Sequence, residues 1–412
     1  MEQVIQATQG RNHEEVSNMI VGNYLTFLYG KGELITWLIE GETGIGKTAL
    51  TRLVAKTINR KVRDSKFLSK KYKVLADKEM PYRLIDGASS DVADFSIPAL
   101  DSERKCVEFY GNASIGLDAL EPQVFNIDEM LKMPPPVKAA THTALTPHNR
   151  MLGNMPLHPL SLVLLTGNLT AERLGDTIQG HTANRIVRVR LRKPTQDEYV
   201  HYAVSQDYNP FVIGYCAKTP ALFESFTDAD YDPKENNKVW NPKNGGAQQC
   251  FTMRSGETLS HIVYSWLGFD DDDGNHVAGM LSDTEAMEAM QGAVGNDVAQ
   301  DFRAFVKYNQ HLPSPDSIKS DWQTAKTTDD PIAHCIIVTQ ALSWCKTTDD
   351  INAFMNYCTR LTTKSGDVNH EAVNMFVSRG KDIFKNTIFD AEKFRDWCLD
   401  KSYINSKHTP SV

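Results

Sequence analysis

A glycine-rich segment between an apolar run and a helical pattern constrains the fold more than any other feature of the chain. Residues 34–39 are apolar apart from one threonine, which predicts a buried strand, and 48–59 has apolar residues at helical spacing. The segment between them matches the pattern G-x-x-x-x-G-K-[ST] at every specified position. Its residues are Gly41, Glu42, Thr43, Gly44, Ile45, Gly46, Lys47 and Thr48. A strand, this loop and a helix together predict a phosphate-binding loop (P-loop).

The residue types in this loop explain the chemistry it predicts. Glycines let the backbone wrap so that its N–H groups face a phosphate, and the helix N-terminus adds the positive end of a dipole. We expect Lys47 to reach the β- and γ-phosphates as a point charge and Thr48 to offer its hydroxyl to Mg²⁺. The motif thus predicts binding of a nucleoside triphosphate, without distinguishing one base from another.

Two further strands are predicted to end in polar side chains. The run at 124–127 is followed by Asp128 and Glu129, and the run at 161–166 is followed by Gly167 and Asn168. Because the carboxyl ends of parallel strands share one rim of a sheet, we expect these side chains near the glycine-rich loop. Asp128 would hold Mg²⁺ through water, Glu129 would act as general base on the attacking water, and Asn168 would hold that water or the γ-phosphate.

The rest of the pattern places these segments in an α/β architecture. Apolar strands alternate with helical stretches over the first 190 residues, which predicts a parallel sheet flanked by helices; beyond Pro194 helical stretches dominate. In the last predicted strand, 186–191, apolar and basic residues alternate, which indicates a strand at the sheet edge. A basic stripe for nucleic acid is the alternative reading of its arginines. The apolar set is Val187, Val189 and Leu191, and the basic set is Arg188, Arg190 and Arg192.

Composition excludes several classes of protein. The formal net charge is −8 and the pI is about 5.9, which argues against a general nucleic-acid coat. No stretch approaches 18 apolar residues, and the first residues lack a basic region followed by an apolar run, so neither a membrane span nor secretion is expected. The seven cysteines lack the spacing of a zinc or redox pair, which favours reduced thiols in a cytoplasmic protein.

The order of P-loop, Asp-Glu strand and Asn-tipped strand resembles the AAA+ ATPases, and more narrowly the MoxR and dynein-related (midasin-like) branch. Residues 128–137 resemble the "DE-hx+-x-P-P-x-h" stretch of that branch. Residues 182–186 resemble its "NRF" segment with Ile186 in place of Phe, and 251–255 resemble the "PRS" opening of a lid helix with Met253 in place of Pro. The resemblance covers roughly residues 10 to 310. The last hundred residues are only loosely similar to extensions of phage-encoded members.

This resemblance implies a specific architecture and site. The five-stranded sheet should have the order 5-1-4-3-2. Residues 1–193 would form the AAA+ α/β nucleotide-binding domain, 194–312 a helical lid and 313–412 a helical C-terminal extension. ATP and Mg²⁺ would be the cofactors. Arg185 would be the finger that reaches a neighbouring subunit's nucleotide, with Arg173 as the reserve candidate, and Arg254 would act from the lid as a sensor of the γ-phosphate.

The resemblance also implies partners. The chain would form a homo-oligomeric ring, most simply a hexamer, that remodels a protein substrate, and a partner with a von Willebrand A domain is implied. A nucleic-acid-linked NTPase, either a helicase loader or a GTP-using restriction-type translocase, is the alternative. The location would be cytoplasmic, in the host cytoplasm for a viral protein. Residues 146–159 are expected to form a hairpin whose Met151, Leu152 and Met155 either grip a substrate or belong to the local core.

Overall fold

The computed structural model describes residues 10–119, 121–169, 180–229, 231–242, 249–271, 275–309 and 312–399. The chain divides into two compact units, which in the described residues are 10–194 with 241–242, and 195–240 with 249–399. The predicted lid and C-terminal extension both fall in the second unit, and their separate roles stay predictions. Across the described ranges no helix combines the length and the apolar character that a bilayer crossing requires.

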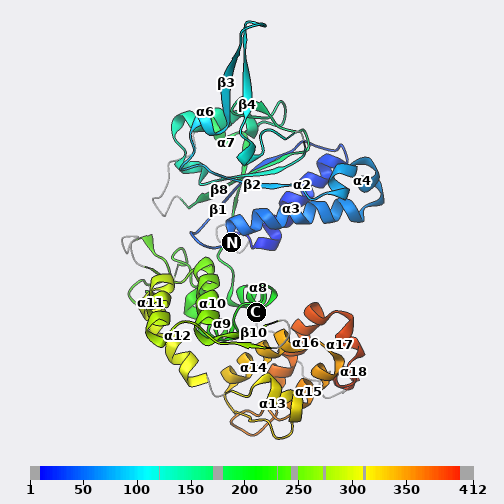
Figure 1. Cartoon of the computed structure of the whole chain (residues 1–412), viewed down its shortest axis with the longest axis vertical. Helices are drawn as coiled ribbons and strands as arrows, with labels where there is room; N and C mark the ends of the chain where they lie inside the picture. The colour runs from blue at the N-terminus through cyan, green and yellow to red at the C-terminus, as the bar shows by residue number, and fades with distance from the viewer. Residues whose placement is uncertain are drawn as a thin grey trace. The chain divides into compact units, whose positions relative to one another are not determined.

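A five-stranded parallel sheet forms the centre of the first unit (Figure 1). Its spatial order is β2-β5-β8-β1-β9, which reads 5-1-4-3-2 from the β9 edge when the five strands are counted along the chain. The α/β parallel sheet expected from the sequence is therefore present, with each predicted strand end within two residues of the observed one. The strands are β1 (Thr36–Gly41), β2 (Tyr82–Asp86), β5 (Val124–Asp128), β8 (Leu162–Asn168) and β9 (Ile186–Arg190).

Alternate residues of the central strands enter two different cores, so the unit has three layers. Trp37 and Ile39 of β1 pack with helices α2 (His13–Leu28) and α3 (Lys47–Asp64), whereas Leu38 packs with the cluster that includes Val137 of α6 (Pro135–Thr141). Short helices α4 (Lys66–Lys71) and α5 (Lys73–Asp77) follow α3, and α7 (Gly180–Ala183) precedes β9. Burial on both faces explains why β1 and β8 are mostly apolar without a regular alternation of apolar and polar residues.

The edge strand β9 departs from the strict alternation predicted for it. Val189 and Leu191 are buried as expected, but Val187 is 37% exposed. The outer edge of this strand is partly covered, because the backbone of Arg11 exchanges hydrogen bonds with Arg190 and Arg192. The predicted position at the sheet edge is therefore confirmed, and Val187 is an apolar residue of this strand that stays exposed.

Strand register brings the polar strand ends together. Gly41 of β1 lies opposite Asn168 of β8, and Asp86 of β2 lies opposite Asp128 of β5. All five strands run in the same direction, so the loop after β1, Asp128 and Asn168 lie on one rim of the sheet.

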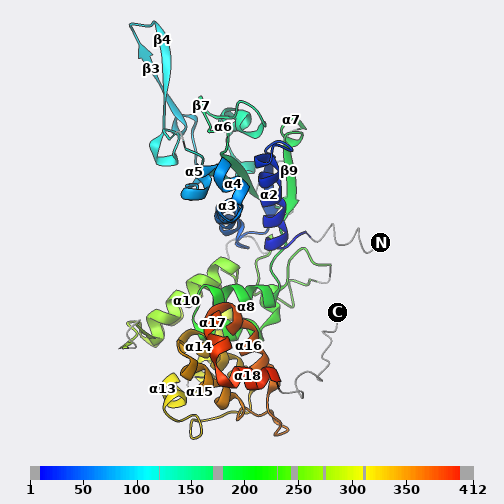
Figure 2. The same ribbon diagram turned by 90° about the vertical axis from the view of Figure 1, so that its right-hand side faces the viewer.

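Two antiparallel hairpins are inserted into this α/β unit. β3 (Ser96–Asp101) and β4 (Cys106–Gly111) lie between β2 and β5 in the chain and extend away from the sheet in both views (Figures 1 and 2). β6 (Met151–Leu152) and β7 (Met155–Pro156) form a shorter hairpin within the predicted segment 146–159.

The second unit is mainly helical and contains two hydrophobic clusters. The first cluster is formed chiefly by α8 to α12 and the second by α13 to α18. Helix α14 joins them, since its Ile336 packs in the first cluster and its Ile337 in the second. A two-residue hairpin, β10 (Phe269–Asp270) with β11 (His276–Val277), follows α10. The helices are α8 (Gln196–Ser205), α9 (Pro210–Lys218), α10 (Met253–Leu267), α11 (Asp283–Val294), α12 (Asn296–Asn309), α13 (Pro315–Asp321), α14 (Pro331–Trp344), α15 (Thr348–Cys358), α16 (His370–Phe384), α17 (Asn386–Asp390) and α18 (Glu392–Leu399).

Candidate functional site

The loop between β1 and α3 has the tight backbone that its glycines predict. Gly44 and Gly46 adopt positive φ values of 76° and 92°, a region that favours glycine. A Cβ on Gly41 would lie 2.6 Å from the Ile45 Cδ1 and 2.8 Å from the Leu191 carbonyl oxygen. Gly46 is the N-cap of α3 and offers no side chain to the first helical N–H groups. The start of α3 is therefore available to an external anion.

Lys47 connects this loop to the tip of β8. Its Nζ donates to the carbonyl oxygens of Gly41 at 2.9 Å and Glu42 at 2.7 Å, and to the Asn168 Oδ1 at 2.9 Å. The lysine is 9% exposed, so these oxygens replace water around its charge. Two residues predicted from separate motifs, Lys47 and Asn168, thus meet at the same point of the rim.

Asp128 lies beside the loop at the end of β5. Its Oδ2 accepts a hydrogen bond from the Thr48 hydroxyl at 3.4 Å, and its Oδ1 accepts from the Thr166 hydroxyl and, at 3.1 Å, from the Glu129 backbone N–H. A carboxylate and a hydroxyl side by side are hard oxygen donors of the kind that Mg²⁺ binds. The pair Thr48 and Asp128 therefore fits the metal that the sequence implies.

Glu129 has an unusual backbone conformation. Its φ of 51° and ψ of 37° place it in the left-handed helical region, which costs a non-glycine residue about 1–2 kcal/mol. The chain turns sharply here, and the carboxylate forms an ion pair with Lys132 at 2.7 Å. The side chain is about one-third exposed. Glu129 is therefore accessible at the rim next to Asp128, where a general base would be required.

His13 is a site residue that the sequence analysis missed. Its Nε2 lies 2.9 Å from the Ile45 carbonyl oxygen, so Nε2 carries the proton and donates it. Because a trans peptide is planar, a carbonyl held toward His13 turns the N–H of Gly46 in the opposite direction. The first residue of α2 therefore fixes one peptide plane of the loop.

Arg185 lies at the opposite end of the sheet from this loop. It directly precedes β9, and Ile186 is in register with Thr36 at the start of the parallel strand β1. At about 3.3 Å per residue, Arg185 is about 20 Å from the loop of its own chain. The side chain is exposed, and its Nη1 lies 2.6 Å from the Nδ1 of His142. The chain's own loop is thus beyond its reach, and Arg173 lies outside the described residues.

Arg254 belongs to the second compact unit. It is the second residue of α10, which begins with a capping box between Thr252 and Ser255, and its side chain is exposed. The predicted opening of a helix at 251–255 is therefore present. Its role toward a nucleotide stays a prediction.

The arginines of β9 do not form a uniform basic stripe. Arg188 makes a bidentate ion pair with Glu40 of β1, with Nε to Oε2 at 3.0 Å and Nη2 to Oε1 at 2.9 Å. Glu40 is 8% exposed, so its buried carboxylate requires this cation. An acidic residue inside an apolar strand was the signal that could have predicted the pairing.

Exposed apolar side chains were considered for the hairpin β6–β7, but the structure also has them on the hairpin β3–β4. Leu152 of the expected hairpin is fully buried, which assigns it to the core and rules out a gripping role. The hairpin β3–β4, which the sequence analysis missed, carries Ile97, Leu100 and Tyr110 at 62%, 83% and 64% exposure. The exposed apolar surface therefore lies on an element inserted before β5.

Comparisons with known proteins leave the family of the chain open. Neither a scan against protein-family models nor a search of curated proteins gives a match. Among solved structures, the chain is similar to Hsp104 in a closed-state reconstruction with ATPγS and FITC casein, with 16% sequence identity and a TM-score of 0.36. The match covers 75% of this chain and 48% of the Hsp104 chain, so it spans about half of that protein. At this TM-score the likeness assigns neither a family nor a function.

Proposed function

We propose that the chain is an ATPase of the AAA+ type, of the MoxR and dynein-related branch. The single observation that supports this most is the meeting of three independently predicted motifs on one rim. The Lys47 ammonium bonds the Asn168 amide oxygen, and the Thr48 hydroxyl bonds the Asp128 carboxylate. When bound, Mg·ATP supplies the phosphoryl group that is transferred to water and the divalent charge that stabilises it.

Each residue then has a defined task. The loop 41–48 binds the phosphates through its N–H groups, and Lys47 neutralises their charge. Thr48 and Asp128 hold Mg²⁺, directly and through water respectively. Glu129 accepts the proton of the attacking water. Asn168 positions that water or the γ-phosphate.

Two arginines complete the proposed site from elsewhere. Arg185 lies about 20 Å from its own loop, so it acts on the nucleotide of an adjoining subunit. Turnover then requires a ring, and we propose a hexamer. Arg254 acts from the helical unit as a second sensor of the γ-phosphate. Nucleotide state would thereby bias the helical unit as a lid against the sheet.

The ring would remodel a protein partner. The exposed apolar side chains of β3–β4 are the kind of surface that a protein partner buries. Pairing of Arg188 with Glu40 leaves β9 less suited to a nucleic-acid backbone. We therefore retain protein remodelling, with a partner carrying a von Willebrand A domain as a candidate, as the proposed function.

Hydrolysis measured against protein concentration tests this proposal. We expect ATP turnover per chain to rise steeply as subunits assemble. Arg185→Ala should lower turnover by about 10³-fold or more, while Arg63→Ala, which changes an exposed arginine on α3, should leave it unchanged.

A mixing experiment shows whether Arg185 acts between subunits. Glu129→Gln retains the finger but lacks the base, and Arg185→Ala retains the base but lacks the finger. Mixing the two inactive proteins should restore part of the turnover. Full activity of Arg185→Ala alone would exclude the finger role, and absence of turnover in the unaltered chain at every concentration would exclude the ATPase.

A further inference from the structure

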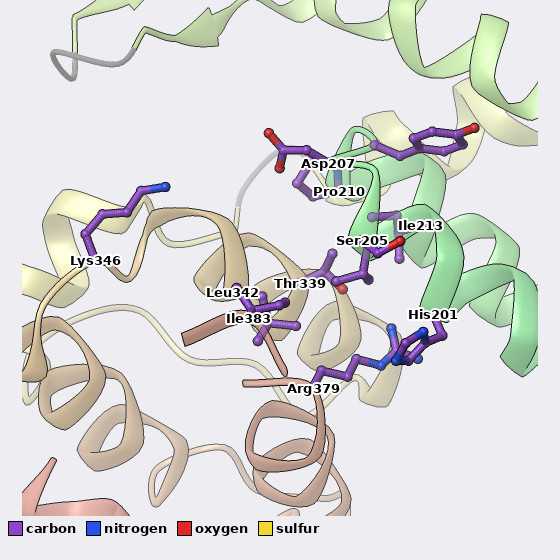
Figure 3. Close-up of a pocket in the computed structure, with 12 residues that line it drawn as sticks. His201, Ser205, Asp207, Pro210, Ile213, Thr339, Leu342, Lys346, Arg379 and Ile383 are labelled. Atoms are coloured by element: carbon purple, nitrogen blue, oxygen red, sulfur yellow. The ribbon is translucent and has the colours of Figure 1, made fainter. Parts of the chain in front are cut away.

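The second compact unit contains a partly enclosed cavity of about 400 Å³. It lies between α8 and α9 on one side and α14 and α16 on the other (Figure 3). Ile213 and Leu342 line it as buried residues, so part of its wall is apolar. This volume is within the range of small-molecule sites in proteins.

Arg379 of α16 is a half-buried residue of the cavity wall. Its Nη1 is inaccessible to solvent and has no hydrogen-bond partner among the residues that the structure describes. Burial lowers the pKa of this guanidinium, and the nearby Cys335 and Asp197 offset that effect in part. A buried guanidinium N–H without an acceptor is strongly unfavourable, because it has lost water and gained nothing in return. Arg379 therefore lines the cavity with a guanidinium whose hydrogen-bonding capacity the described residues do not fully use.

The surroundings of Arg379 favour an anionic acceptor. Figure 3 shows its side chain directed toward His201 of α8, with Lys346 also lining the cavity. Two carboxylates are near: Asp207 lines the cavity, and Asp197 acts on Arg379 without lining it. Both are exposed to solvent, which screens their charge. The fork of a guanidinium matches the paired oxygens of a carboxylate or phosphate group.

We propose that this cavity binds a small organic oxyanion, a carboxylate or phosphate attached to an apolar body. The oxyanion would bond the Arg379 guanidinium after a rotation of that side chain turns Nη1 from its enclosed position into the cavity, and the apolar body would contact Ile213 and Leu342. This second site lies wholly within the helical unit and is chemically independent of the nucleotide loop.

Binding of matched probe molecules to the full chain tests the proposal. Phenyl phosphate and benzoate each combine an oxyanion with an apolar ring, whereas benzyl alcohol has the ring without the charge. Isothermal titration should show saturable binding of at least one charged probe and none of the alcohol. The stronger of the two charged probes identifies which oxyanion the site prefers. The titration should be repeated in Lys47→Ala, so that binding at the P-loop is not mistaken for binding here.

Two substitutions on the same helix distinguish specific binding at Arg379 from non-specific attraction of the probe to positive charge. Arg379→Met should weaken binding at least tenfold, and Lys381→Gln, which removes an exposed cation two residues away, should leave it unchanged. Because Arg379 has an unpartnered buried donor, Arg379→Met should also keep or raise the thermal midpoint without ligand. Equal affinity of Arg379→Met and the unaltered chain, or no saturable binding of either charged probe, would overturn the proposal.

A third variant, Lys346→Gln, tests the proposal even if Arg379→Met does not fold. Lys346 is exposed, so Lys346→Gln should fold normally. It should weaken binding of the charged probe by about twofold or more at low salt and less at high salt, because its charge is screened. If Arg379→Met does not fold, an unchanged affinity in Lys346→Gln at low salt would count against the proposal.

Discussion

Removal of the His13 side chain should weaken nucleotide binding without unfolding the protein. His13→Ala deletes the hydrogen bond from Nε2 to the Ile45 carbonyl oxygen, 2.9 Å long and partly buried. The N-cap Asn12 and its capping box with Glu15 remain, so α2 should still begin at residue 13. The change therefore acts on the loop more than on the helix.

The magnitude follows from one neutral hydrogen bond. Such a bond contributes about 0.5–1.5 kcal/mol, so the affinity for nucleotide should fall by at most about 2- to 13-fold when the Gly46 N–H is no longer held in place for the phosphate. Titration of a fluorescent ATP analogue measures the dissociation constant directly. His148→Ala is the matched control, because that histidine is exposed and pairs with Glu33 away from the loop.

A urea melt of the same variants shows whether His13 orients the loop for nucleotide or only packs α2 against it. We expect His13→Ala to change the free energy of unfolding by less than it changes the free energy of nucleotide binding. If the unfolding free energy falls while the dissociation constant does not change, His13 only packs α2 against the loop, and the peptide-plane reasoning is incorrect.

Three further predictions concern charge pairs and exposed surface. Arg188→Gln leaves the buried Glu40 unpaired and should lower the free energy of unfolding, measured in a urea melt, by about 1–3 kcal/mol. Glu40→Gln should lower it less, because the guanidinium that it leaves unpaired is half-exposed. Equal losses would show that the burial of Glu40 does not matter. The Arg303 guanidinium lowers the pKa of Asp283 to about 2. The ion pair of these two residues therefore stabilises the fold above about pH 4, and this stabilisation is lost as the pH falls toward 2. Asp283→Asn should therefore lower the thermal midpoint more at pH 6 than at pH 2.5. The same decrease at both pH values would show that the ionised Asp283 carboxylate does not stabilise the fold. Leu100→Ser should reduce binding of the dye ANS at an unchanged midpoint, and a lower midpoint would show that Leu100 packs in the core.

The sequence predicted the central sheet because its signals are local. Each central strand is an apolar run bounded by polar or glycine residues, and each motif lies directly at a strand end. Parallel pairing then places Lys47, Asp128 and Asn168 on one rim without further information. Strand ends and rim residues were therefore accessible from sequence alone.

Contacts between distant segments were not accessible in this way. The bond between His13 and Ile45 depends on how α2 packs beside α3, and the pair of Arg188 with Glu40 joins residues 148 positions apart. The β3–β4 hairpin was missed because its apolar residues face solvent, so its pattern has no buried face, and Pro98 interrupts it. Burial of Leu152 likewise depends on tertiary packing, which an apolar hairpin sequence leaves open.

Equilibrium binding of Mg·ATP to the unaltered chain and to Lys47→Ala shows whether a nucleotide binds at the rim formed by the loop 41–48, Asp128 and Asn168. Lys47 bonds both the loop and Asn168, so its removal should abolish measurable binding, with a thermal melt to verify that the variant is folded. We expect saturable, Mg²⁺-dependent binding in the unaltered chain and none in the variant. Equal binding by both proteins, or no binding by either, would contradict this expectation.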